Sequence, residues 1–86
     1  MYSKRFGKDV VVTEHARKRM SERNIDASIL SDLIETGSIR RMDLEHLFIY
    51  KQYPDRHDNL MCAAAVEEDH LVIKTVMIRW TLREQT

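Results

Sequence analysis

The chain has 86 residues, enough for one domain with a small hydrophobic core, and we expect residues 1–86 to form that domain. Hydrophobic residues make up 43% and charged residues 33%, which excludes a disordered chain. No apolar run is long enough to cross a bilayer, and the single cysteine excludes an internal disulfide. We therefore expect a cytoplasmic protein with no membrane partner.

The charges balance overall but are unevenly distributed. Lys and Arg number 14, as do Asp and Glu, so the net charge is zero. Residues 1–41 hold nine Lys or Arg against six Asp or Glu, whereas residues 42–86 hold five against eight. This asymmetry predicts a local positive field, too weak for strong non-specific binding to DNA. A solvated, salt-bridged surface explains the same numbers.

The N-terminal third predicts an exposed lead-in, a short strand and a helix. Residues 1–8 read as a flexible lead-in, and three β-branched residues at 10–12 favour an extended segment. Thr13 is a suitable N-cap, and Asn24 tolerates the left-handed conformation that ends helices. On a helical wheel, His15, Arg19 and Arg23 lie beside a narrow apolar stripe of Ala16 and Met20.

A second helix follows after a single short turn. Asp26 is suited to cap it, Leu30, Leu33 and Ile34 contribute to its apolar face, and Gly37 is a good terminator. The two helices are therefore expected to form a hairpin.

From Ser38 the hydrophobic period changes from that of a helix to that of strands. The predicted strands are 38–42, 46–53, 60–66 and 71–80, with a polar loop at 54–59, a hairpin turn at 67–70 and a tail at 81–86. The predicted fold class is α+β, with an N-terminal helical hairpin packed on one face of a mainly antiparallel sheet of about four strands.

Pairing Val66 with Leu71 places Cys62 opposite Thr75 and leaves both faces of this hairpin largely apolar. Two helices cover only one face of a sheet. The second face is then covered by a terminal segment, a second copy of the chain or a partner protein. We predict a homodimer or a complex on this basis.

No phosphate-binding glycine loop or metal-ligand motif is present in the sequence. Two turns, at 55–58 and 67–70, combine acidic residues with histidine, but turns are rich in such residues for conformational reasons. We predict no metal site and no cofactor.

The constellation with chemical content is His15, Arg19 and Arg23 on one helix, facing strand residues such as Lys74 and Thr75. Metal-free cleavage of RNA needs a base for the 2′-hydroxyl proton and cations around the phosphorane, and histidine and arginine suit these tasks. A structural histidine flanked by solvated arginines explains the same residues.

The run EHARKRMSERNID, the apolar helix, Gly37 and the closing HLVIKTVMIRW resemble domain-of-unknown-function family 4258 over roughly residues 10–78. Members occur beside phage, plasmid and toxin genes. The matching positions are His15, Arg19, Arg23, Ile25 and Thr75. The resemblance implies a compact domain similar to the barnase–colicin–RelE group of small ribonucleases, which includes toxins of toxin–antitoxin pairs.

The leading hypothesis is thus a metal-independent, RelE-like ribonuclease toxin held by an antitoxin. His15 is the general base or acid, Arg19 clamps the phosphate and Thr75 orients the substrate. Cationic side chains guide the RNA backbone, namely Lys18, Arg23, Arg40 and Lys74. The rival is a non-catalytic interaction or dimerisation domain that binds through the second sheet face. A third hypothesis, a metal-dependent hydrolase, needs a metal at one of the acidic turns.

Overall fold

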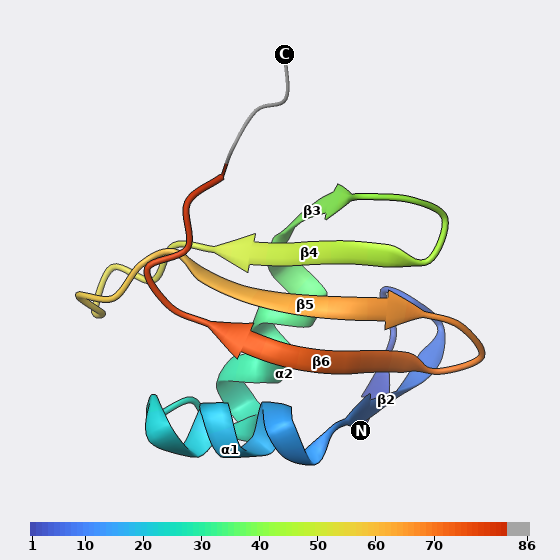
Figure 1. Cartoon of the computed structure of the whole chain (residues 1–86), viewed down its shortest axis with the longest axis horizontal. Helices are drawn as coiled ribbons and strands as arrows, with labels where there is room; N and C mark the ends of the chain where they lie inside the picture. The colour runs from blue at the N-terminus through green and yellow to red at the C-terminus, as the bar shows by residue number, and fades with distance from the viewer. Residues whose placement is uncertain (83–86) are drawn as a thin grey trace.

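The computed structural model describes residues 1–82, and within them one curved six-stranded sheet packs against two helices (Figure 1). The elements are β1 (Tyr2–Ser3), β2 (Lys8–Val12), α1 (Glu14–Glu22), α2 (Ala27–Thr36), β3 (Ser38–Arg41), β4 (His46–Lys51), β5 (Met61–Glu67) and β6 (Leu71–Met77). No helix in this part of the chain is both long and apolar enough to span a membrane.

The strand order is β1-β2-β6-β5-β4-β3, and the sheet is mixed because β2 runs parallel to β6. Val10 pairs with Leu71 and Val12 with Ile73, while every other neighbouring pair is antiparallel. The α+β class is correct, but the predicted arrangement is wrong. The sheet is a half-barrel of six strands, and both helices follow two strands instead of forming an N-terminal hairpin on a four-stranded antiparallel sheet. The prediction of a RelE/barnase-like arrangement is therefore also wrong, because it was based on the same helical hairpin and four-stranded sheet.

Strand β1 lies in the segment expected to be a flexible lead-in, and β2 extends the short strand predicted at 10–12 back to residue 8. The Glu35 carboxylate on α2 accepts hydrogen bonds from Ser3 Oγ (2.8 Å) and from the backbone N–H groups of Lys4 (2.7 Å) and Arg5 (3.2 Å). Ser3 is only 1% exposed. These contacts hold β1 against α2, and they join residues about 30 positions apart, a distance over which hydrophobic periodicity carries no information. The predicted tail reaches residues 83–86, which lie outside the described residues.

The helix signals in the sequence are confirmed. Thr13 caps α1 by accepting a hydrogen bond from Ala16 N at 3.1 Å, and Asp26 caps α2 by accepting one from Ile29 N at 2.8 Å. Asn24 has a left-handed backbone with φ 54° between the helices. Gly37 ends α2, but its φ is −70°. A Cβ there would lie only 2.6 Å from the Leu33 carbonyl oxygen, so close packing explains the glycine.

The predicted pairing of β5 with β6 is wrong by one residue at the turn and by another at a bulge. Val66 pairs with Val72, Ala65 with Ile73 and Ala64 with Thr75, so Lys74 is the extra residue of the bulge. Leu71 and Ile73 consequently face the helices together with Ala65. The composition of the two strands could not reveal the bulge, because one extra residue on β6 shifts the pairing without changing the kinds of residue present.

The core lies between α1, α2 and one face of the sheet. Its largest fully buried side chains include Leu30, Leu33, Ile34, Leu47, Ile49, Met61, Leu71, Ile73 and Val76. Figure 1 shows α2 behind the sheet, α1 along β6, and no helix in front. We call the face that carries no helix the open face. It holds the candidate site.

Candidate functional site on the open face of the sheet

Alternation along the strands places polar and aromatic side chains on the open face. Leu47 and Ile49 of β4 are buried toward the helices, so His46, Phe48 and Tyr50 project to the opposite side. Arg40 of β3 pairs with Phe48 and shares that side. The open face is thus an aromatic strand flanked by charged residues.

The residues after β6 fold back over this aromatic strand. The Arg79 backbone is left-handed (φ 52°), and its N–H donates to the Asp58 carbonyl at 2.7 Å. The Trp80 N–H donates to the Leu60 carbonyl at 3.0 Å, and the Trp80 ring lies 5.4 Å from Phe48 and 5.1 Å from Tyr50, centroid to centroid. The sequence analysis offered a terminal segment, a second copy or a partner protein as the cover of this face. Residues 78–82 are such a terminal segment, and they cover the part of the face around Phe48 and Tyr50.

A hollow of about 560 Å³ opens beside Trp80, and we call it the Trp80 hollow. Three arginines from distant parts of the chain line it, Arg23 after α1, Arg40 in β3 and Arg79 after β6. The other lining residues are Met42, Phe48, Met77, Ile78, Trp80 and Thr81. Every charged residue among the described lining residues is therefore an arginine.

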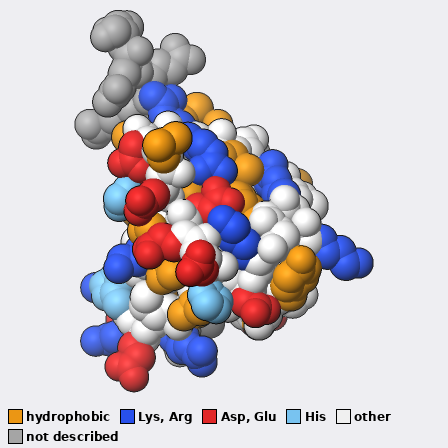
Figure 2. Space-filling view, turned by 90° about the vertical axis from the view of Figure 1, so that its right-hand side faces the viewer, with side chains coloured by type: hydrophobic (Ala, Val, Ile, Leu, Met, Phe, Trp, Pro, Cys, Tyr) orange, Lys and Arg blue, Asp and Glu red, His pale blue; other side chains and the backbone are white. Residues whose placement is uncertain are grey.

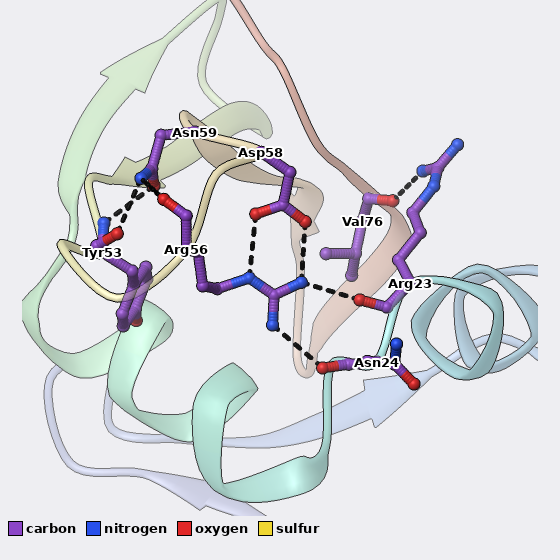
Figure 3. A network of polar contacts seen from close by, with 7 residues as sticks. All are labelled: Arg23, Asn24, Tyr53, Arg56, Asp58, Asn59 and Val76. Carbon is purple, nitrogen blue, oxygen red and sulfur yellow. Dashed lines mark hydrogen bonds and ion pairs between the residues drawn. The ribbon is translucent and has the colours of Figure 1, made fainter.

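The 54–59 loop holds the backbone of Arg23 in place, as Figure 3 shows. It also accepts the hydrogen bond from the Arg79 backbone N–H. Arg56 donates two hydrogen bonds to the Asp58 carboxylate, at 2.9 and 2.7 Å. The same guanidinium donates to the carbonyl oxygens of Arg23 (2.7 Å) and Asn24 (2.9 Å), which close the end of α1. This leaves the Arg23 side chain directed to β6, where it donates to the Val76 carbonyl. The pKa of Asp58 is lowered, chiefly because Arg56 donates to its carboxylate.

A second hollow, of about 530 Å³, adjoins the first because Met42 and Phe48 line both. We call it the His46 hollow. Its charged or titratable lining residues are Glu45, His46, Glu68 and Lys74, so both signs of charge meet there. Figure 2, which views the end of the sheet where the 42–45 and 68–70 turns lie, shows acidic, basic and histidine side chains interspersed.

Asp43 orients His46 at this hollow. The Asp43 carboxylate accepts hydrogen bonds from the backbone N–H groups of His46 (2.7 Å) and Glu45 (2.9 Å), and it lies 3.0 Å from His46 Nδ1. These backbone donors, together with the imidazole, lower the pKa of Asp43 to about 2. The contact between the Asp43 carboxylate and Nδ1 fixes the orientation of the imidazole and leaves Nε2 on the side away from Asp43.

The structure gathers some of the predicted site residues and separates others. Arg23 and Arg40 line the Trp80 hollow, and Lys74 lines the His46 hollow. Thr75 is half-buried on β6, opposite Ala64, which lines the His46 hollow.

The remaining predicted residues lie on α1. His15 and Lys18 are exposed, and Arg19 forms an ion pair with Glu22 at 2.7 Å on the same helix. Neither hollow is lined by any of these three residues.

Phe48, Trp80 and His46 were not predicted as site residues. The alternation of Phe48 and Tyr50 with the buried Leu47 and Ile49 is a signal that could have indicated an aromatic surface. The contribution of Trp80 depends on the backward fold of residues 78–82, which no local pattern shows. Within residues 1–82, no group of three His, Cys, Asp or Glu side chains is placed to hold a metal ion.

The comparisons with known proteins identify the family. The model of the family described as Domain of unknown function (DUF4258) matches residues 12–78, and the chain belongs to this family. The resemblance in the sequence is thereby confirmed. The matched region contains Arg23, Arg40, His46 and Lys74, while Trp80 follows its end. No curated protein and no solved structure matches the chain.

Proposed function

We propose that the chain binds RNA on the open face and cleaves it without a metal ion, as a cytoplasmic toxin restrained by an antitoxin-like partner. The observation that supports this proposal is the set of four cationic side chains around an aromatic surface on a face that carries no helix. These side chains are Arg23, Arg40, Lys74 and Arg79. Cations suit the RNA backbone, and aromatic rings suit unpaired bases.

In the proposed reaction the 2′-oxygen of one nucleotide attacks the adjacent phosphorus. The 2′-O–P bond forms while the P–O5′ bond breaks, giving a 2′,3′-cyclic phosphate and a free 5′-hydroxyl. His46, oriented by Asp43, takes the 2′-hydroxyl proton, and water supplies a proton to the leaving 5′-oxygen. Lys74, which lines the same hollow as His46, stabilises the negative charge that develops on the phosphorane.

A second assignment of the catalytic roles uses the residues on and near α1 that the sequence analysis predicted. His15 then acts as base or acid, Arg19 clamps the phosphate and Thr75 orients the substrate, with Lys18 on the path of the RNA backbone. This set places the reaction along α1. The two sets differ in which histidine is required, and single substitutions distinguish them.

The test is incubation of the purified chain with a single-stranded RNA in EDTA, followed by analysis of the new ends. We expect 2′,3′-cyclic phosphate ends and no cleavage of the corresponding DNA, which lacks the 2′-hydroxyl. His46→Ala is expected to slow cleavage by about 100-fold or more, the usual effect of losing a general base.

His57→Ala is the matched control, because His57 is an exposed histidine in the 54–59 loop and lines neither hollow. If the His46→Ala variant cleaves RNA as fast as the native chain and the His15→Ala variant does not, His15 is the base. Absence of cleavage by the native chain would contradict the ribonuclease proposal.

The alternative is a non-catalytic interaction or dimerisation domain. One observation favours it: at the rim of the open face, Leu44 is 94% exposed and Met42 is 50% exposed. Exposed apolar side chains beside an aromatic face suit a partner protein or a second copy of the chain. Light scattering of the native chain and of Leu44→Ser tests this, since a homodimer through this rim would dissociate on substitution.

A further inference from the structure

The Trp80 hollow has the size and the composition of a site for one nucleotide. Its volume of about 560 Å³ lies within the range of small-molecule sites. One wall is aromatic, because Trp80 packs against Phe48 and Tyr50 and all three rings are only partly buried. The charged residues of its lining are three arginines. A ligand that fits must combine a flat ring with negative charge.

The three guanidiniums are available to such a ligand. Within residues 1–82, the arginines that form ion pairs are Arg19, Arg41 and Arg56, and none of the three arginines of the hollow is among them. Arg23 donates through Nη1 to the Val76 carbonyl, which fixes the direction of its side chain, and the other nitrogen atoms of that side chain donate no hydrogen bond to residues 1–82. Arginine binds phosphate oxygens in a bidentate manner, so these side chains suit a phosphodiester.

The aromatic wall distinguishes a nucleotide from a simple anion. Every base has a π-face, and stacking on an aromatic side chain contributes about 1–3 kcal/mol per base. A base inside a duplex has both faces covered by its neighbours. Stacking on Trp80 therefore selects an unpaired base.

We propose that the Trp80 hollow binds one unpaired nucleotide of single-stranded RNA, with its base against Trp80 and its phosphate among Arg23, Arg40 and Arg79. This inference deepens the proposed function and rests on it for the identity of the polymer as RNA. It assigns recognition of the strand to the Trp80 hollow and leaves the reaction to the His46 hollow or to α1.

The sequence supplies its own probe, because Trp80 is the only tryptophan of the chain. The ligand for the test is a five-nucleotide 2′-O-methyl oligoadenylate, whose blocked 2′-oxygen prevents cleavage. We expect it to change the Trp80 fluorescence in a saturable manner and to bind at least tenfold more tightly than a 2′-O-methyl hairpin that holds the same five adenylates in its base-paired stem. Inorganic tripolyphosphate, which carries charge but no base, is expected to bind more weakly than the oligonucleotide.

Arg40→Gln is expected to weaken binding of the oligoadenylate by about tenfold, and Arg17→Gln to leave it unchanged. Arg17 is an exposed arginine on the flank of α1 that lines a different cavity, and circular dichroism checks that both variants fold. Equal effects of the two substitutions would overturn the assignment of the hollow. Calorimetric binding of the oligonucleotide without any change in Trp80 fluorescence would overturn it as well.

The two proposals fail separately. Cleavage of unmodified RNA with no response of Trp80 to the analogue would overturn the nucleotide site and leave the ribonuclease proposal. A Trp80 response without cleavage would support the site and contradict the ribonuclease. An acidic peptide tests whether the hollow binds a protein instead of a nucleotide. The measurement is whether the peptide binds and whether it displaces the oligonucleotide. Binding of the peptide alone would overturn the inference.

Discussion

The two hollows of the open face are alike in size but differ in charge and in support. The Trp80 hollow has only arginines as charged lining residues, whereas the His46 hollow combines Lys74 with Glu45 and Glu68. The first is held by the Arg56–Asp58 ion pair, whose side chains are 20% and 18% exposed, and the second by an Asp43–His46 contact that is 59% exposed on both sides. A surface whose charged residues are all cationic suits binding of a polyanion. A surface that holds a histidine beside both acidic and basic side chains suits acid–base chemistry.

The largest expected effect comes from removing the support of the Trp80 hollow. Arg56→Ala leaves Asp58 unpaired and two carbonyl groups at the end of α1 without their donor. We expect the free energy of unfolding to fall by about 2–3 kcal/mol, because a largely buried charge loses its partner. Urea unfolding measures this, with the exposed Lys18→Ala as control. A loss as small as that of the control would show that the loop does not support the site.

The structural role of Arg56 could not be predicted from the sequence. Local signals predicted both helices, their caps Thr13 and Asp26, and the terminator Gly37, because these depend on neighbours within a few residues. The sequence places Arg56 in a polar loop and Asp58 in an acidic turn considered for a metal, and it assigns neither residue a contact with α1. Their contacts reach Arg23 and Asn24, more than 30 positions away. The same reason explains why the parallel pairing of β2 with β6, the bulge at Lys74 and the position of Trp80 were missed.

A smaller effect is expected from changing the charge of the His46 hollow. Glu68→Gln removes a negative charge beside Lys74 and is expected to strengthen binding of the oligoadenylate by about twofold, as for a screened surface charge. The matched change outside both hollows, Glu14→Gln in the first turn of α1, should not affect binding. Weaker binding by Glu68→Gln would indicate that Glu68 contacts the ligand as a hydrogen-bond acceptor.

The smallest effect concerns acid stability. The folded-state pKa of Asp43 is about 2, below its usual 3.8, so its stabilising contribution is present above about pH 4 and is lost as the pH falls towards 2. Asp43→Asn, which cannot titrate, is expected to lose less thermal stability than the native chain between pH 4 and pH 2. Melting temperatures across this window measure the difference. Parallel curves would show that Asp43 is not held by these hydrogen bonds.

The most direct test of the central claim, that the open face binds single-stranded RNA, is an NMR titration of the isotopically labelled chain with the 2′-O-methyl oligoadenylate. We predict the largest shift changes at the Trp80 indole N–H and at the backbone amides of Arg40 and Phe48, with little change along α2 on the opposite side of the sheet. Changes confined to α2, or their absence at Trp80 when the ligand is in excess, would contradict the account.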